Sequence, residues 1–111
     1  MYTLAIDNLV DVPVKFTIKS RATVKQFAFT LTAKKLDEDE IQAYLENKDG
    51  KIRDFVTDVV TDWSGQRLVL DDAGEPAAFS PDAFAAMLNV AGVAGVFFSA
   101  YLKEVRAKEK N

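Results

Sequence analysis

The acidic residues are the side chains whose spacing comes nearest to a site for chemistry. Residues 37–40 place four carboxylates in succession, and Asp71, Asp72 and Glu75 form a second acidic group. Carboxylates bind hard cations, but a calcium loop needs ligands at alternating positions and a distal Glu, and that spacing is missing. Acidic residues in the first turn of a helix also interact favourably with the helix dipole. We therefore predict a helix start at the first group, a tight turn at the second, and no metal site.

Other groups on which enzymes depend are missing. The sequence has no histidine and no cysteine, which excludes a thiolate nucleophile and the side chain most used for proton transfer near neutral pH. Ser64, Ser80 and Ser99 have no histidine to activate them, and no Ser-x-x-Lys pair stands in for one. Gly92 and Gly95 are not followed by the Gly-Lys-Ser/Thr of a phosphate loop. We predict a protein without catalytic residues and without a cofactor.

Length and charge limit the kinds of partner. A chain of 111 residues, of which 49% are hydrophobic, is expected to form one domain with a core. Its net charge is −3 and its Lys and Arg are scattered, which argues against nucleic-acid binding, because affinity for phosphates comes mainly from clustered basic side chains. The most apolar stretch, residues 90–102, is too short for a transmembrane helix. The N-terminus lacks the features of a signal peptide. We expect a cytoplasmic protein with neither nucleic acid nor membrane as a partner.

Residues 1–35 show the alternation of β-strands. Apolar and polar side chains alternate in three runs, residues 2–6, 14–18 and 27–33, which places one face of a sheet on a core and the other in water. The sequence predicts a small antiparallel meander. Its turn at residues 20–23 holds no glycine, so the register of that hairpin stays open.

Residues 36–107 show the period of helices instead. Asp37 and Glu40 have the spacing of a capping box, and Leu36 and Ile41 flank it as a hydrophobic staple. That helix is predicted to stop at residues 47–50. A second helix is predicted over residues 52–63, because its apolar residues recur along one stripe. This stripe consists of Ile52, Phe55, Val56, Val59, Val60 and Trp63.

Two further helices follow. Ser80 is predicted as an N-cap with Pro81 in the first helical position, and Phe79 and Phe84 as a staple. Residues 92–95 hold two glycines that break or thin the helix, and residues 96–105 are apolar nearly all round, as in a central core helix or one covered by another chain. The expected fold is therefore α+β: an N-terminal antiparallel β-meander (1–35), a bundle of about four α-helices (36–107) and a frayed tail (108–111) in a single domain.

Apolar side chains in the last third of the chain exceed what so small a domain obviously needs. Each of them alone fits an ordinary core, but together they predict a partner-binding or oligomer face. The residues are Phe84, Met87, Phe97, Phe98 and Tyr101.

The order of short motifs adds a resemblance to a known family. An apolar helix ends in Trp63-Ser64-Gly65, an acidic turn holds Gly74-Glu75-Pro76, Phe79-Ser80 opens another helix, and residues 97–101 close the chain as Phe-Phe-x-Ala-Tyr before a charged tail. From about residue 14 onward this order resembles the tail assembly chaperones of long-tailed bacteriophages. The motifs are structural, and no catalytic signature accompanies them.

The resemblance implies a non-enzymatic role in a phage or prophage. Such chaperones bind the long tape measure protein before the tail tube polymerises, keep it soluble in the host cytoplasm and are absent from the finished virion. The implied partners are the tape measure protein and the tail tube protein, with self-association as a further hypothesis. Three alternatives stay open: a structural tail or tube component of the virion, an unrelated bacterial protein-binding adaptor, and an acid-dependent metalloenzyme.

Overall fold

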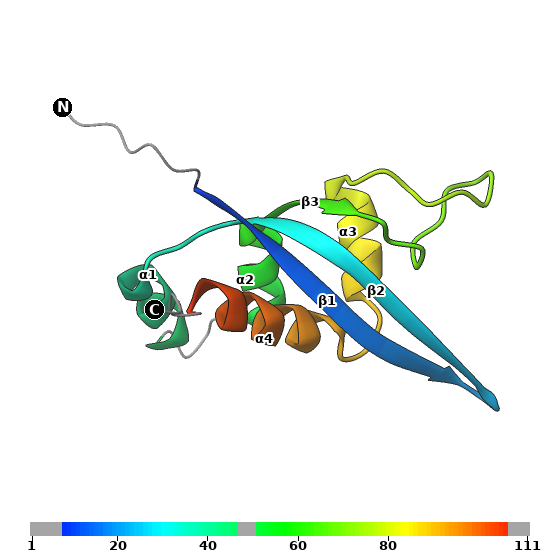
Figure 1. Ribbon diagram of the computed structural model, residues 1–111, viewed down its shortest axis with the longest axis horizontal. Helices are drawn as coiled ribbons and strands as arrows, with labels where there is room; N and C mark the ends of the chain where they lie inside the picture. The colour runs from blue at the N-terminus through cyan, green and yellow to red at the C-terminus, as the bar shows by residue number, and fades with distance from the viewer. Residues whose placement is uncertain (1–7, 47–50, 107–111) are drawn as a thin grey trace, which may run out of the picture.

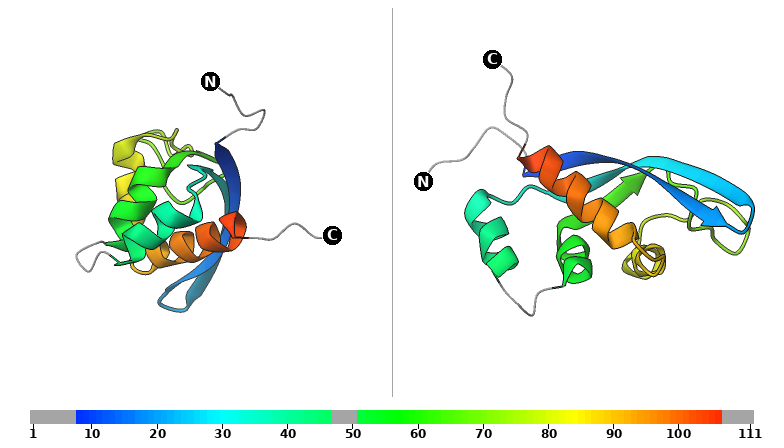
Figure 2. Two further views of the ribbon diagram at one scale, coloured as in Figure 1. Left: turned by 90° about the vertical axis from the view of Figure 1, so that its left-hand side faces the viewer. Right: turned by 90° about the horizontal axis from the view of Figure 1, so that it is seen from below.

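The structure is a computed structural model that describes residues 8–46 and 51–106. An antiparallel sheet of order β1-β2-β3 carries the helices on one face (Figures 1 and 2). In chain order the elements are β1 (Leu9–Ser20), β2 (Thr23–Lys34), α1 (Glu38–Glu46), α2 (Ile52–Val59), β3 (Val60–Ser64), α3 (Pro81–Leu88) and α4 (Val93–Val105). The predicted α+β fold, with an antiparallel sheet and about four helices, is confirmed for the described residues. The first predicted strand (2–6), the predicted helix end (47–50) and the tail (108–111) lie outside them.

Strands β1 and β2 form a long hairpin of twelve residues on each side. They pair around a two-residue turn, Arg21 and Ala22, with Ser20 opposite Thr23. Arg21 has φ 56°, in the left-handed region that residues other than glycine seldom adopt. The turn end projects beyond the helices, and residues 15–27 are called the distal hairpin below (Figures 1 and 2).

The third strand of the sheet comes from a segment predicted to be helical. The predicted helix over residues 52–63 ends at Val59, and Val60 has extended backbone, φ −78° and ψ 127°. Residues 59–61 are β-branched, which lowers their helix propensity. The edge of β2 offers this segment a ladder of hydrogen bonds, and Trp63 pairs there with Leu31. The prediction of one helix was therefore wrong from Val60 onward.

A β-bulge explains why the sequence pattern of β3 looked helical. Val60 and Trp63 are three residues apart, so a regular strand would turn them to opposite faces. The pairing register shifts between Thr32 and Ala33, which leaves Thr61 as the extra residue of a bulge. Val60 and Trp63 are consequently both buried, as they would be on one face of a helix.

Helix α3 begins as its predicted capping signals require, and of the two glycines predicted to break or thin the last helix, Gly92 precedes α4 while Gly95 lies within it. The Ser80 hydroxyl accepts the Ala83 N–H at 3.0 Å, and the rings of Phe79 and Phe84 lie 5.6 Å apart, as an N-cap with a hydrophobic staple requires. Gly92 has φ 85° and separates α3 from α4, because it adopts the left-handed conformation at low cost. In the described part of the chain no single helix is long and apolar enough to cross a membrane; α3 and α4 together reach that length and composition, but the pair is bent by 106° at its break.

Candidate functional site

Four of the five predicted partner-binding residues lie in the core. Phe84, Met87, Phe97 and Tyr101 are only 2%, 0%, 1% and 2% exposed. The bend between α3 and α4 lays both helices against the sheet, and these side chains fill the space between the layers. They therefore leave no surface for a partner, which corrects the prediction for these four. Phe98 is partly exposed, and its ring packs edge-on against Phe55 with centroids 5.2 Å apart.

Tyr101 has an internal structural role. Its hydroxyl donates a hydrogen bond to the Lys34 carbonyl oxygen at 2.6 Å and accepts one from the Leu36 N–H at 3.0 Å. It thereby ties α4 to the end of β2 and the start of the segment that leads into α1. Burial raises the pKa of the Tyr101 hydroxyl, because the phenolate is disfavoured away from water.

We expect Tyr101→Phe to lower the free energy of unfolding by about 1–2 kcal/mol at pH 7, because both hydrogen bonds are lost while the ring stays. The pKa of Tyr101 is raised in the folded state. The protonated hydroxyl therefore stabilises the folded protein fully below the unfolded-state pKa of about 10, and this stabilisation is lost as the pH rises above that value. Urea unfolding at several pH values between 7 and 11 measures both effects. The variant should lose less stability above pH 10 than the wild type does, and identical pH profiles would contradict this role.

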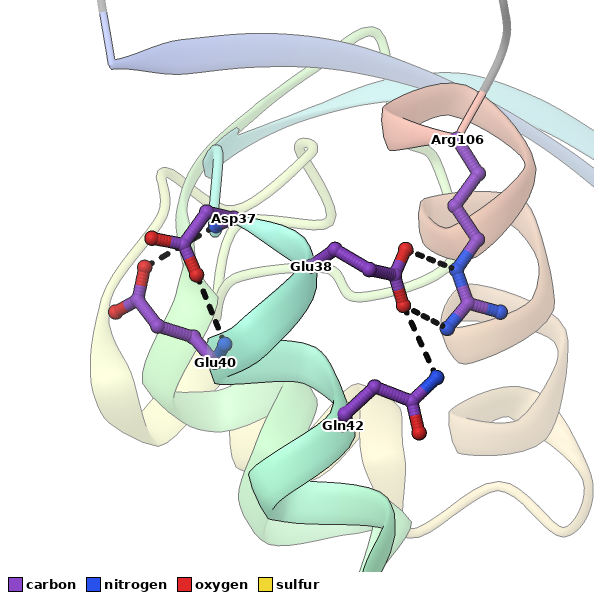
Figure 3. A network of polar contacts seen from close by, with 5 residues as sticks. All are labelled: Asp37, Glu38, Glu40, Gln42 and Arg106. Carbon is purple, nitrogen blue, oxygen red and sulfur yellow. Dashed lines mark hydrogen bonds and ion pairs between the residues drawn. The ribbon is translucent and has the colours of Figure 1, made fainter.

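The acidic group at residues 37–40 is engaged within the fold (Figure 3). The Asp37 N–H donates to Glu40 Oε1 at 3.1 Å and the Glu40 N–H donates to Asp37 Oδ1 at 2.8 Å, which confirms the predicted capping box. Glu38 accepts hydrogen bonds from Arg106 Nε and Nη2 at 3.1 and 2.8 Å, and from Gln42 at 3.0 Å. The Arg106 guanidinium, followed by Gln42, lowers the pKa of the Glu38 carboxyl. These contacts fix the start of α1 against the end of α4.

The second acidic group contributes to a turn. The Asp71 carboxylate accepts the N–H groups of Ala73 and Glu75 at 2.9 and 3.0 Å, and the Gly74 N–H donates to the Asp71 carbonyl oxygen at 3.0 Å. This confirms the predicted tight turn. Within residues 8–46 and 51–106, no three acidic side chains are grouped so that they could hold a metal ion.

A groove lies between the distal hairpin and the segment that follows β3, and we call it the hairpin groove. It has a volume of about 570 Å³. Strands β1 and β2 supply one wall and residues 67–70 supply the other. The lining residues are Ile18, Ser20, Arg21, Thr23, Lys25, Phe27, Arg67, Leu68 and Leu70.

Gln66 positions the second wall of the hairpin groove. Its side chain is buried, with Nε2 donating to the carbonyl oxygens of Val69 and Ala77 at 2.9 and 3.1 Å. Its Oε1 accepts the N–H groups of Leu68 and Val69 at 3.0 and 2.8 Å. One amide side chain therefore satisfies four backbone groups of an irregular segment, and this holds residues 67–70 beside the hairpin. Sequence reasoning missed Gln66, because nothing local distinguishes it from an exposed glutamine.

The hairpin groove combines an apolar floor with a basic rim. Ile18, Phe27 and Leu68 are partly buried, and Leu70 is 53% exposed. Three cationic side chains border the floor, and no lining residue is acidic. These cations are Arg21, Lys25 and Arg67. The ion pair of Glu38 with Arg106 is the only one among the described residues, so none of the three cations is neutralised by a carboxylate there.

The sequence does contain a signal for this site. Residues 15–27 carry four basic side chains and no acidic one, within a chain whose net charge is −3. Those side chains are Lys15, Lys19, Arg21 and Lys25. The arrangement offers apolar contact and positive charge, without a group for covalent or acid–base chemistry. The described residues thus form a small α+β domain whose groove combines apolar contact area with positive charge.

Comparison with known proteins found no match among family models, curated proteins or solved structures.

Proposed function

We propose that this chain is a non-enzymatic, protein-binding assembly factor whose partner occupies the hairpin groove. Within that class we propose a tail assembly chaperone of a long-tailed phage or prophage, acting in the host cytoplasm on the tape measure protein. The observation that carries the proposal is the partly exposed apolar floor, bordered by three cations that form no ion pair with the described carboxylates. Such a surface is unfavourable in water and favourable against the apolar, partly acidic surface of another protein.

The motifs of the resemblance support the proposal by their place in the fold. Trp63 lies in β3 and donates its indole N–H to the Ala77 carbonyl oxygen at 3.0 Å. Gly65 and Gly74 have φ 82° and 79°, values that explain a glycine at each turn. Pro76 pairs with Leu70 in an isolated bridge. None of these four motif residues lines the groove, but they flank and support the segment that contains its second wall, residues 67–70.

A chaperone of this kind acts by covering apolar surface. A tape measure protein is long, helical and apolar before the tube encloses it. The hairpin groove covers part of such a segment, and the net negative charge of the chaperone keeps the complex dispersed. No bond is formed or broken, and release follows when tube subunits compete for the same segment.

The test begins with gene order, since the proposal expects a tape measure gene next to the gene of this chain, and continues with co-expression of the two proteins. We expect the tape measure protein to be soluble and to co-purify with this chain, and to precipitate without it. Equal solubility in both cases would overturn the chaperone proposal.

Leu70→Glu is expected to weaken this complex about 10- to 100-fold, because burial of a leucine side chain contributes about 1.5–3 kcal/mol. Leu45→Glu is the matched control, since Leu45 is 44% exposed on α1, outside the groove lining. The amount of tape measure protein that stays soluble and co-purifies with each co-expressed variant measures the effect. If both changes weaken binding equally, or neither does, the groove is not the binding site.

The alternatives lead to different observations. A structural tail or tube component would be found by mass spectrometry of purified particles, whereas a chaperone is absent from them. A bacterial adaptor would be encoded away from a tape measure gene. A metalloenzyme would gain thermal stability with divalent cations, and we expect no such gain.

A further inference from the structure

Among residues 8–46 and 51–106, no strand pairs with the outer side of β1, which is therefore an edge of the described sheet. The pairing register shows which backbone groups of β1 point outward. In a hairpin with a two-residue turn, the residues that flank the turn exchange both backbone hydrogen bonds, and every second pair along the ladder does the same. Ser20 and Thr23 flank the turn here. The even-numbered residues of β1 therefore bond to β2, and the odd-numbered residues point their N–H and C=O groups to the open side. The Lys35 N–H donates to the Asn8 carbonyl oxygen, which agrees with this alternation.

Pro13 marks where this open edge is interrupted. It is an odd-numbered residue of β1, so its missing N–H falls on the open side and no hydrogen bond to β2 is lost. A proline at an outward position prevents another strand from pairing there. Beyond it, Lys15, Thr17 and Lys19 present their N–H groups without interruption. These three residues are exposed, and this part of the strand projects beyond the helices (Figure 1).

The positive charge beside this part of the edge favours an added strand that carries acidic residues. An added strand places its side chains about 5 Å from those directly opposite on β1. Lys15 and Lys19 lie on the outer face of the sheet, four residues apart, and residues 15–27 contain no acidic residue. Acidic side chains on the added strand would pair with both lysines. Its alternate side chains would point to the inner face, beside the partly buried Phe16 and Ile18, and apolar residues fit there.

We propose that the edge of β1 from Lys15 to Ser20 binds an extended protein segment in which acidic and apolar residues alternate, by addition of a fourth strand to the sheet. This edge adjoins the hairpin groove, whose lining includes Ile18 and Ser20, but it binds through backbone groups and does not depend on the identity of the client. A nucleic acid fits it less well, because backbone pairing requires a polypeptide and the chain as a whole is acidic.

The test uses the full chain and a capped synthetic peptide, Glu-Val-Glu-Val-Glu-Val-Glu, with binding measured by titration calorimetry. Thr17→Pro removes one outward N–H and leaves the ladder to β2 intact, as Pro13 already does, so we expect affinity to fall at least tenfold. Thr17→Val is the matched control, which keeps the N–H and should bind like the wild type. Equal affinity of the two variants would overturn the proposal.

Two further variants separate loss of binding from loss of folding. Pro13→Thr restores an outward N–H, and we expect a longer peptide of the same alternation to bind it about fivefold more tightly, a gain that unfolding cannot produce. The double variant Lys15→Glu and Lys19→Glu should bind the acidic peptide about tenfold more weakly and should prefer a peptide with lysine in place of glutamate. No change in either variant would overturn the proposal.

The same measurements identify other occupants of the edge. Analytical sedimentation tests self-association. If the wild type formed dimers and Thr17→Pro did not, the edge would bind a second copy of this chain, and the proposal would be overturned. A single-stranded oligonucleotide is the second probe. The proposal would also be overturned if the oligonucleotide bound equally well to Thr17→Pro and Thr17→Val while the peptide bound to neither.

Discussion

Replacement of Phe97 by alanine is expected to lower the free energy of unfolding by about 3–5 kcal/mol. The ring is buried where three parts of the fold meet. Its centroid lies 6.1 Å from that of Phe16 on β1, 5.9 Å from that of Phe29 on β2 and 6.1 Å from that of Phe84 on α3. The deletion leaves a cavity that none of these elements can close alone. Because small domains are stable by only about 5–15 kcal/mol, the variant should be close to unfolding at 37 °C.

Urea unfolding followed by circular dichroism measures this loss. Ser99→Ala is the control, since Ser99 is exposed on the same helix and its replacement should change the stability by less than about 0.5 kcal/mol. A loss below about 1 kcal/mol for Phe97→Ala would mean that the aromatic cluster does not join the sheet to α3 and α4.

Gln66→Leu is expected to cost about 2–4 kcal/mol and to disable the hairpin groove. Leucine has a similar volume but no polar atoms, so the N–H groups of Leu68 and Val69 lose their partner in a buried setting. The segment that carries Arg67 and Leu70 then loses its fixed position beside the hairpin. Stability and partner binding should therefore fall together.

Gln42→Leu is the matched control for this prediction. Gln42 is exposed on α1 and makes one side-chain hydrogen bond, to Glu38 at 3.0 Å. We expect a change within about 0.5 kcal/mol and no change in partner binding. Thermal unfolding and titration with the partner distinguish the two variants, and equal effects would show that Gln66 has no special role.

Local interactions made part of the fold predictable. The capping box of Asp37 and Glu40, the N-cap Ser80 and the turn at Asp71 each depend on residues two to four positions apart. Their geometry is set by the backbone itself, so the spacing in the sequence is enough. The alternation along the hairpin was predictable in the same way, but its register was not, because the two-residue turn of Arg21 and Ala22 contains no glycine or asparagine to mark it.

The third strand could not be predicted in this way. Val60 and Trp63 fit one face of a helix, and they share the buried face of a strand only because Thr61 forms a bulge. That strand gains its hydrogen bonds from β2, about thirty residues earlier in the sequence. Pairing with a distant strand therefore decided the structure of this segment, against the helical spacing of its apolar residues.

Four of the five predicted partner-binding residues are buried for a related reason. Aromatic residues dominate both cores and interfaces, so Phe84 and Phe97 had the composition of an interface while the fold uses them as core. The hairpin groove is formed by residues 18–27 and 67–70, which become neighbours only when Gln66 folds the second segment back. The charge imbalance of the distal hairpin was visible in the sequence, but its meaning depended on that contact.

The ion pair between Glu38 and Arg106 has a practical consequence for handling the protein. It holds the last turn of α4 beside α1, at the opposite end of the molecule from the hairpin turn (Figure 1). The described part of α4 therefore ends at the side remote from the groove and from the distal part of β1, which favours the C-terminal end for a linker, fluorophore or capture tag. Immobilisation through that end keeps both surfaces accessible to a partner in solution.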